Sequence, residues 1–481
     1  MIFLDVNNEE YYDDIRVMTL SFFPGSKVSV EKQDAEDAKV AVKAEFADNI
    51  VKLWVADRYC EFETDFSDKK RTHDELKTKL YDMFGNLTGK TLPWGILTGV
   101  RPSKIVYSML ERQCSEEEIF RHMKEHYRVS DEKIHLALTV AKKEKSILDT
   151  LDYDNGYSLY IGIPFCPTTC LYCSFTSYPL SKWENQVDKY LDALIREMEA
   201  VSTEYVGKTL DTVYFGGGTP TTLTPEQLDR LLSALYRCFD MTKVKELTVE
   251  AGRPDSVTRE KLMVLKKHHV TRISVNPQTM NQATLDLIGR KHTVEQVCQA
   301  FNMARECGFD NINMDLIVGL PGETIQEVEN TMKEIEKLNP DSVTVHSLAI
   351  KRAAALKIWK EKYTDYEMVN NDEIMELTHR YAAKIQQKPY YMYRQKNMAG
   401  NFENVGFARE GKEGIYNILI MEEKQTILAL GAGASSKFVF PRENRIERVE
   451  NVKDVRNYIE RIDEMIARKI DFIRKGRHGE A

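Results

Sequence analysis

Three of the eight cysteines in this chain of 481 residues lie close together, at Cys166, Cys170 and Cys173. Their spacing is Cys-x3-Cys-x2-Cys, and they directly follow the run SLYIGIPF, which predicts a β-strand. We therefore expect the three thiols on the loop at the C-terminal end of a strand. Cysteine thiolate is the standard ligand of iron–sulfur clusters. Three such ligands can bind three irons of a cubane cluster and leave the fourth iron open.

Three other interpretations of these cysteines stay open at this point. A structural zinc site needs four protein ligands, and no fourth Cys or His stands at a suitable spacing. A redox dithiol would use the pair Cys170 and Cys173, which leaves Cys166 without a role. Plain buried cysteines are the third alternative. The iron–sulfur interpretation uses all three thiols and needs no fourth protein ligand.

The composition describes a globular protein with enough apolar residues for a large core, since 42% of residues are hydrophobic and 30% are charged. The net charge of -8 argues against a protein that binds nucleic acid mainly through electrostatics. No stretch approaches the ~18 consecutive apolar residues of a membrane span. The other five cysteines are scattered, which is unlike a disulfide framework and predicts a reducing, cytoplasmic location.

Three regions of different pattern predict three domains. Residues 1–150 combine strand-like and helical runs and are expected to form an α+β module. Residues 151–355 alternate six strand-like runs with amphipathic segments, which predicts parallel strands joined by helical crossovers. Because about 200 residues is short for a full eightfold barrel of ~250, we expect a partial, six-stranded (β/α)6 barrel of the TIM type. Residues 356–481 are expected to form a mostly helical domain.

The cysteine segment YIGIPFCPTTCLYCSF (160–175) resembles a known family. Cys-x3-Cys-x2-Cys with an aromatic residue before the last cysteine resembles the signature of the radical S-adenosylmethionine superfamily. More narrowly, the segment is similar to the oxygen-independent coproporphyrinogen III oxidase (coproporphyrinogen dehydrogenase) family, in its HemZ-like branch. The resemblance extends over about 200 residues, from Tyr160 to Ile350.

The resemblance implies a site built from successive strand ends. The cluster ligands would be Cys166, Cys170 and Cys173. Aromatic, glycine and polar residues would bind S-adenosylmethionine, with Arg290 on its carboxylate and Asp315 on its ribose hydroxyls; guanidinium matches carboxylate geometry. The implied cofactor-binding residues are Tyr160, Tyr172, Gly217, Gly218, Thr219, Glu250, Gln278, Arg290 and Asp315.

The sequence departs from the family pattern at four places. Gly162 stands where the family has a histidine, Pro254 follows Glu250 one residue later than in the family's Glu-x-x-Pro, and Asn276-Pro277 replaces a more usual Gly-x. The authentic oxidase carries a further cysteine two places after the third, whereas Ser174 and Phe175 follow Cys173 here.

The family implies a [4Fe-4S] cluster, one or two S-adenosylmethionine molecules and an electron donor such as flavodoxin or ferredoxin. Its reaction removes hydrogen from a propionate side chain through a 5′-deoxyadenosyl radical, and loss of carbon dioxide and one electron then leaves a vinyl group. Two rounds convert coproporphyrinogen III to protoporphyrinogen IX in heme biosynthesis. The alternatives within the family are a heme chaperone and a tetrapyrrole methyltransferase.

Two further features suggest partner chemistry. The run PYYMYRQK places Tyr390, Tyr391 and Tyr393 beside Arg394 and Lys396, a combination that could bind a flat substrate carrying carboxylates. An interdomain packing loop is the alternative interpretation of this run. A heme carrier would need axial ligands, and the candidates are His268, His269, His292 and His346.

Overall fold

The computed structural model describes residues 1–99, 101–153, 155–173, 177–349, 368–394, 402–443 and 445–477. These form two compact units. The first contains Met1–Lys142 together with Arg394 and Phe402, and the second contains most of the chain from Lys143 onward. Ser174, Phe175 and Lys396, which figure in the sequence-based expectations, lie outside the described residues.

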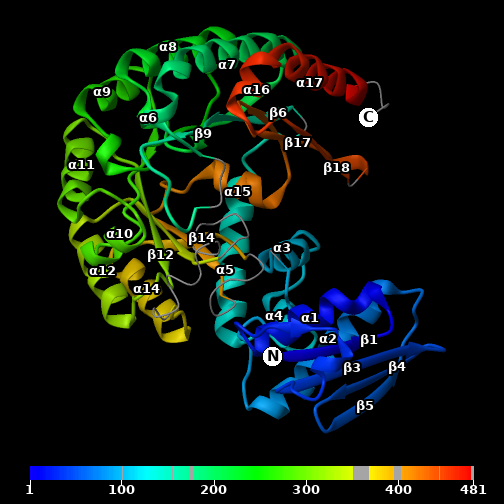
Figure 1. The fold of residues 1–481 in the computed structure, drawn as a ribbon. Coiled ribbons are helices and arrows are strands. Elements are labelled where there is room, and N and C mark those ends of the chain that lie inside the picture. The colour runs from blue at the N-terminus through cyan, green and yellow to red at the C-terminus, as the bar shows by residue number, and fades with distance from the viewer. Residues whose placement is uncertain are drawn as a thin grey trace. The chain divides into compact units, whose positions relative to one another are not determined.

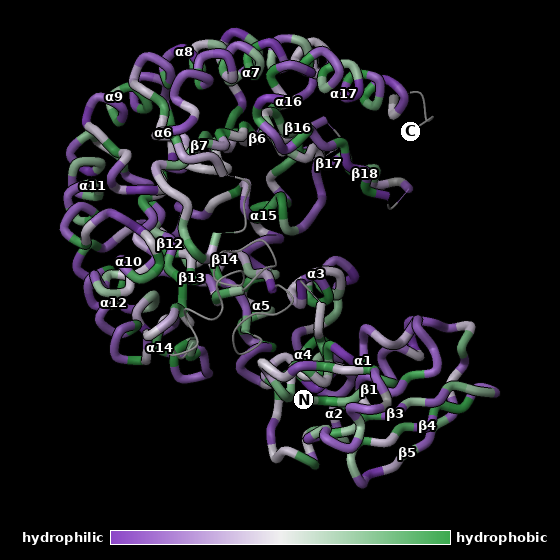
Figure 2. Tube along the Cα trace, in the orientation of Figure 1, coloured by the Kyte–Doolittle hydropathy of each residue, from purple (hydrophilic) through white to green (hydrophobic). Residues whose placement is uncertain are grey.

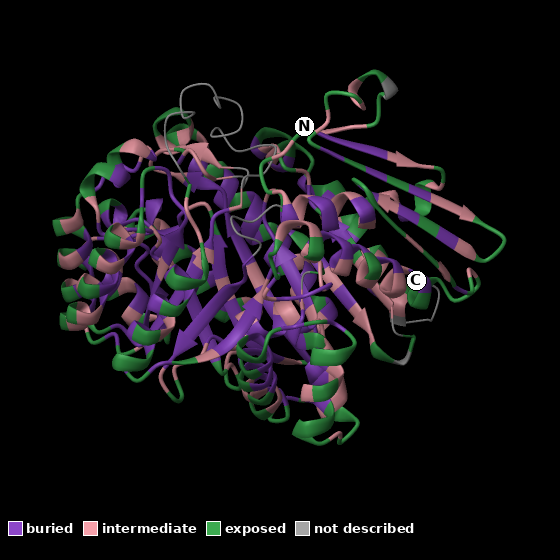
Figure 3. Cartoon of the chain, turned by 90° about the horizontal axis from the view of Figure 1, so that it is seen from below, coloured by how far each residue is buried: buried purple, intermediate pink, exposed green. Residues whose placement is uncertain are grey.

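The first unit is built on a five-stranded sheet in the order β2-β1-β3-β4-β5. Strand β1 pairs in parallel with β2 and β3, and the remaining pairs are antiparallel. Alternate residues of β3 and β4 are buried, because successive side chains of a strand point to opposite faces (Figure 3). Its elements are β1 (Ile2–Val6), α1 (Glu9–Phe22), β2 (Val28–Ser29), β3 (Val40–Ala47), β4 (Ile50–Val55), β5 (Arg58–Glu63), α2 (Lys69–Thr88), α3 (Ser103–Glu111) and α4 (Glu116–Glu125), followed by α5 (Asp131–Leu148), which continues into the second unit.

The second unit contains an eleven-stranded sheet in the order β14-β15-β13-β12-β11-β10-β9-β6-β16-β17-β18. Six consecutive members, from β13 through to β6, pair in parallel with their neighbours. This confirms the predicted partial (β/α)6 barrel. These strands are β6 (Gly156–Ile163), β9 (Thr209–Gly217), β10 (Glu246–Glu250), β11 (Arg272–Ser274), β12 (Ile312–Val318) and β13 (Ser342–Ser347).

Helices connect the parallel strands and form an outer arc around them (Figure 1). Helix α8 illustrates why: Thr224 and Gln227 form a capping box at its start, and Pro225 occupies the first turn. Its leucines recur with helical spacing and are buried against the sheet, whereas hydrophilic residues recur on the outer side of the arc (Figure 2). The helices of this unit are α6 (Leu180–Trp183), α7 (Val187–Ser202), α8 (Pro225–Cys238), α9 (Arg259–Lys267), α10 (Gln282–Leu287), α11 (Val294–Glu306), α12 (Ile325–Leu338), α14 (Asp372–Lys384), α15 (Ile415–Glu422), α16 (Val455–Glu460) and α17 (Ile462–Arg477). Among the helices of the described chain, none is long and apolar enough to cross a membrane.

The region after residue 355, expected to be mostly helical, also supplies five strands to the same sheet. Strand β16 pairs in parallel with β6, and β15 pairs antiparallel with β13. The expectation underestimated these strands because their apolar runs are short and lie between charged helical segments. The strands are β14 (Lys388–Tyr393), β15 (Asn404–Ala408), β16 (Thr426–Leu430), β17 (Ser435–Phe440) and β18 (Arg445–Glu450).

Candidate active site

The cysteine loop begins where β6 ends. A short strand, β7 (Phe165–Cys166), pairs with β8 (Tyr178–Pro179) and brings the two ends of the loop together. The loop base is held by the neighbouring strand end, because the Thr219 amide donates to the Phe165 carbonyl at 2.7 Å. Cys170 is buried, Cys166 and Cys173 are half-buried, and none of the three forms a disulfide with another described cysteine.

Burial dominates the surroundings of the first of these thiols, Cys166. Burial raises the pKa of the Cys166 thiol to about 11, although the Thr219 hydroxyl, 3.6 Å from its sulfur, opposes this shift. Without a metal the Cys166 thiol is therefore protonated, and iron would have to replace its proton. Within the described chain, no three Cys, His, Asp or Glu side chains converge as ligands of one ion. A cluster instead distributes its cysteines over several irons, which fits a looser spacing.

The glycine-rich turn after β9 lies directly against the cysteine loop. The Gly218 amide donates to the Ile163 carbonyl at 2.7 Å, and a Cβ at Gly218 would lie 2.5 Å from the Phe165 carbonyl oxygen. Gly217 has φ +108°, a conformation that favours glycine. The turn therefore needs both glycines in order to bring Thr219 to Cys166.

Arg290 lies at the centre of the predicted site and is 4% exposed. One of its terminal nitrogens donates to the Tyr172 hydroxyl at 2.9 Å and lies 3.9 Å from the Cys170 sulfur. The other donates to the Asn276 carbonyl at 2.6 Å. Its Nε atom is buried without a hydrogen-bond partner. The nearby imidazole of His292, which is fully buried, also has both nitrogens unpartnered. Unsatisfied buried donors are rare in proteins and indicate a place where a ligand or water binds.

Tyr172 connects Arg290 to an apolar surface. Its ring packs against a cluster of side chains from the ends of β12 and β13 and from the segment before Arg290, namely Ile288, Ile317, Leu320 and Leu348. The site thus offers a flat apolar wall beside a buried cation. That pairing suits a molecule with an aromatic part and an anionic part.

Two predicted carboxylates lie within electrostatic reach of each other. The Tyr214 hydroxyl donates to Glu250 at 2.6 Å. Burial is the main cause that raises the pKa of Glu250 to about 7, and the nearby Asp315 adds to the shift. The pKa of Asp315 is lowered: burial alone would raise it, but His346 and Asn313 outweigh that effect. At neutral pH Asp315 therefore only accepts hydrogen bonds, whereas Glu250 is protonated in part of the molecules and can also donate one.

Gln278 and Tyr160 complete the set. Gln278 has φ +70°, and its amide donates to the Asp315 carbonyl at 3.0 Å, which bridges the ends of β11 and β12. Tyr160 stacks with Tyr214 and with Tyr416 of α15, each with ring centroids 6.3 Å apart. The structure therefore brings the predicted residues together along the C-terminal ends of the parallel strands, where barrel enzymes place their chemistry.

Comparisons with known proteins agree with this arrangement. The family model of the radical SAM superfamily matches residues 160–335. Over 428 residues the chain is 40% identical to the oxygen-independent coproporphyrinogen-III oxidase-like protein HemZ of Bacillus subtilis, which covers 87% of this chain and 85% of that relative. The chain belongs to this radical SAM family. The resemblance inferred from the cysteine segment is thereby confirmed.

Two further relatives show the breadth of the family. The heme chaperone HemW of Bacillus subtilis is 32% identical over 308 residues, covering 64% of this chain and 76% of HemW. The solved structure of coproporphyrinogen III oxidase (HemN) from Escherichia coli superposes with a TM-score of 0.53 at 24% identity, over 65% of this chain and 70% of that one. This superposition confirms the fold.

Membership of the radical SAM superfamily implies a [4Fe-4S] cluster and S-adenosylmethionine, and the residues present fit both groups. Three thiols that form no disulfide lie on one loop, a buried guanidinium faces one of them, and its Nε atom has no hydrogen-bond partner among the described residues. The chemistry of these donors matches three irons and a carboxylate.

Sequence reasoning missed Arg253, Asn276 and Tyr214. Asn276 had been noted as a departure from the family; its carbonyl accepts from Arg290 and its side-chain oxygen accepts from the Asp315 amide at 3.2 Å. Tyr214 could have been found from its place on β9, two residues before the glycine-rich turn. Arg253 offered only a weak signal, an arginine three residues after the end of a strand and two residues before an aspartate.

The histidine candidates separate clearly. His292 is fully buried, His268 binds Asp229 at 2.7 Å, and His269 is exposed at the end of α9. His346 alone of the four lies at the strand ends, half-buried, with its Nδ1 atom 3.3 Å from the Tyr393 hydroxyl.

Of the tyrosines in the aromatic run of β14, Tyr390 and Tyr391 are buried. Asn417 donates to the Tyr390 hydroxyl at 3.3 Å. The hypothesis that this run binds a flat substrate therefore depends mainly on half-buried Tyr393 among its tyrosines.

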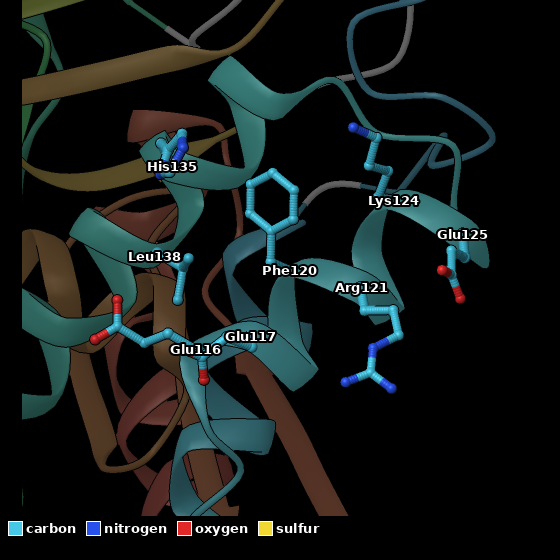
Figure 4. A pocket seen from close by; sticks show the side chains of 8 residues that line it. All are labelled: Glu116, Glu117, Phe120, Arg121, Lys124, Glu125, His135 and Leu138. Atoms are coloured by element: carbon cyan, nitrogen blue, oxygen red, sulfur yellow. The ribbon is translucent and has the colours of Figure 1, made fainter.

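A separate hollow of about 390 Å³ lies on the first unit, between α4 and α5 (Figure 4). Phe120 packs there against His135 at 5.4 Å, and Lys124 lies over the Phe120 ring. The charged side chains around it are exposed, and Glu116 and Lys124 pair with Lys142 and Asp131. We assign it no ligand.

Proposed function

We propose that this protein is a radical SAM enzyme that acts on a tetrapyrrole, and that its reaction is the oxidative decarboxylation of coproporphyrinogen III to protoporphyrinogen IX. The observation that carries the proposal is the joint placement of the three thiols, the unsatisfied Arg290 and the Glu250–Asp315 pair at one edge of the barrel. The HemZ relative, whose name describes it as coproporphyrinogen-III oxidase-like, supports the choice of substrate.

When bound, the cluster and S-adenosylmethionine supply a 5′-deoxyadenosyl radical that removes hydrogen from the substrate. The protein residues would bind these groups and orient them relative to the substrate. Arg290, with its unpartnered Nε atom, is placed to bind the methionine carboxylate. Tyr172 and its apolar cluster form a wall for the adenine and exclude water from the site.

The two carboxylates would form hydrogen bonds with hydroxyl groups of the bound cofactor. Asp315 is held in its charged form by its hydrogen-bonding neighbours and would accept hydrogen bonds from the ribose. Glu250, oriented by Tyr214, is protonated in part of the molecules at neutral pH and can therefore also donate. The proposal includes binding of one or two S-adenosylmethionine molecules on this side of the site, a number to be measured. It also includes an electron donor of the flavodoxin or ferredoxin type, which is to be tested separately.

A heme chaperone is the second candidate function. The specific observation in its favour is that the HemW relative is 32% identical to this chain. His346 is the histidine whose position at the strand ends suits an axial ligand.

The test is anaerobic reconstitution of the full chain with iron and sulfide, followed by dithionite, S-adenosylmethionine and coproporphyrinogen III. Mass spectrometry should detect loss of two carboxyl groups per product, and the Cys170→Ala variant should give none. Formation of 5′-deoxyadenosine without decarboxylation would reject this substrate and favour the methyltransferase alternative. Stoichiometric heme binding without any 5′-deoxyadenosine would favour the chaperone, and His346→Ala should then change the heme absorption spectrum.

A further inference from the structure

The turn after β10 fixes the direction of one arginine that the proposed chemistry leaves unused. Arg253 stands directly before Pro254, and a residue before proline is restricted to extended backbone. Accordingly Arg253 has φ -110° and ψ 120°. Its carbonyl accepts from the Ser256 amide at 2.9 Å and from the Ser256 hydroxyl at 2.7 Å. The backbone of Arg253 is therefore held rigidly.

The guanidinium of Arg253 is held as firmly as its backbone. Its Nε and Nη2 atoms donate to the two oxygens of Asp255, at 2.9 and 2.6 Å, which is the bidentate geometry that arginine favours. The remaining nitrogen, Nη1, donates to the Thr168 hydroxyl at 2.7 Å. Arg253 is only 3% exposed. Thr168 lies between Cys166 and Cys170, the first two predicted cluster ligands.

The hydrogen bond to Thr168 has no substitute in the described part of the chain. Residues 167–169 make no other hydrogen bond there. The segments on either side are anchored, since the Phe165 carbonyl accepts from Thr219 and the Leu171 amide donates to the Ile288 carbonyl at 3.1 Å. The spacing between the sulfurs of Cys166 and Cys170 therefore depends on Arg253 more than on the loop itself.

We propose that Arg253 is a positioning residue that holds the loop between Cys166 and Cys170 in the shape that cluster binding requires, with Asp255 fixing its guanidinium. This inference rests on the proposed function only in taking a cluster to be bound by these cysteines, and it is independent of the substrate. It gives a role to the turn in which Pro254 comes one residue later than in the family pattern.

The experiment separates the hydrogen bond from the charge. Thr168→Val removes the acceptor oxygen and leaves the pair of Arg253 with Asp255 intact. Arg253→Lys keeps the charge and lacks the planar fork, and Arg253→Met removes both. The matched control is Arg230→Met, which breaks an exposed arginine–aspartate pair with Asp192 on the outer helices. Each full-length variant is reconstituted anaerobically with iron and sulfide.

Two readouts are independent of any tetrapyrrole: the rate at which a ferrous chelator removes iron, and the electron paramagnetic resonance spectrum of the reduced cluster with and without S-adenosylmethionine. We expect Thr168→Val and Arg253→Met to lose iron at least about tenfold faster than the wild type, because each removes a charge-assisted hydrogen bond. Arg253→Lys should be intermediate and Arg230→Met unchanged. The spectral change on adding S-adenosylmethionine should become weaker or heterogeneous in Thr168→Val.

Wild-type iron release in Thr168→Val would overturn the proposal. The proposal would also be overturned if Thr168→Val, Arg253→Lys and Arg253→Met all lost the same unfolding free energy and released iron equally fast. That pattern would describe a contact that stabilises the protein in general. If Arg253→Met fails to fold, Thr168→Val decides alone, since it removes a single oxygen from a half-buried side chain. If the variants behave as expected but the wild type leaves coproporphyrinogen III unchanged, the role of Arg253 stands and the proposed substrate is rejected.

Discussion

Two buried cations in the second unit differ in how completely they are paired. Lys469 on α17 forms an ion pair with Glu197 on α7 at 2.5 Å, and both side chains are 0% exposed. The Glu197 carboxylate also accepts from the Gly431 amide, the Asn451 side chain and the Tyr458 hydroxyl, at 2.9, 2.8 and 2.6 Å. Arg290, by contrast, has no carboxylate among its hydrogen-bond partners in the described part of the chain, and its Nε atom has no partner there.

The difference separates a structural cluster from a ligand site. A buried charge is costly unless it is paired and hydrogen-bonded. The pair of Glu197 and Lys469 meets that condition and ties α7 and α17 to the turn after β16. Arg290 lacks a hydrogen-bonded carboxylate, since Asp255 acts on it only at longer range, and a bound carboxylate would supply that contact. Completeness of pairing, rather than burial, indicates which of the two sites awaits a ligand.

The largest expected effect comes from breaking the complete pair. Lys469→Met leaves the Glu197 carboxylate buried without its cation, so the free energy of unfolding should fall by about 3–5 kcal/mol. The double variant Glu197→Gln with Lys469→Met should recover part of this loss, because no charge then remains. Urea titration measures both. A loss below about 1 kcal/mol would show that water reaches the pair and that the cluster is not closed.

Arg290→Met should act in the opposite way. In the protein without S-adenosylmethionine, removing a cation that lacks an anionic partner should change the unfolding free energy by less than about 1 kcal/mol, or raise it. Affinity for S-adenosylmethionine should instead fall by roughly 100-fold, about 2.7 kcal/mol, because a bidentate contact is lost. Equilibrium dialysis of the reconstituted protein gives the affinity. Unchanged affinity would remove Arg290 from the cofactor site.

This contrast also shows what sequence reasoning could and could not reach. The cysteine loop was predictable because its three ligands lie within eight residues and follow a strand. The six parallel strands were predictable from their regular alternation with helices. Glu197 and Lys469 are separated by 272 residues, and nothing local to either one predicts their pairing.

The neighbours of predicted residues were equally hard to infer. Arg253 and Thr168 are 85 residues apart, and Tyr214 and Glu250 are 36 apart. Each contact exists because parallel strands place their C-terminal ends side by side, which is a property of the sheet and not of the segment. The sequence could therefore locate the strand ends, whereas the partners across them required the structure.

Glu250 is intermediate between these two sites in how completely it is paired, because its carboxylate has a single hydrogen bond among the described residues, from Tyr214. Its pKa of about 7 in the folded protein lies above its ordinary 4.5, so the folded state holds the proton more tightly. The stability that the protonated Glu250 contributes to the folded state is fully present below about pH 4.5 and is lost as the pH rises through about 7. Between about pH 5.5 and pH 8 the wild type should lose about 2 kcal/mol from this group.

The Glu250→Gln variant should lack that pH dependence, because glutamine does not titrate. Urea titrations of the cluster-free wild type and variant at the two pH values supply the difference. If the free energy of unfolding changed equally with pH in both proteins, Glu250 would be solvated and would titrate near its ordinary pKa.

The smallest expected effect concerns the Tyr214 hydroxyl, the hydrogen-bond partner of the Glu250 carboxylate. The Tyr214 hydroxyl donates to the carboxylate and so lowers the pKa of Glu250 against the effect of burial. Tyr214→Phe removes the donor while keeping the ring that stacks on Tyr416 at 4.5 Å. The pKa should rise further by roughly 0.5–1 unit, about 1 kcal/mol, so the loss of stability with pH should extend to higher pH. Comparing Tyr214→Phe with and without Glu250→Gln isolates this shift. A shift in the opposite direction would mean that Tyr214 stabilises the protonated acid, and Glu250 would then be a neutral, hydrogen-bonded group rather than a carboxylate that accepts from a ligand.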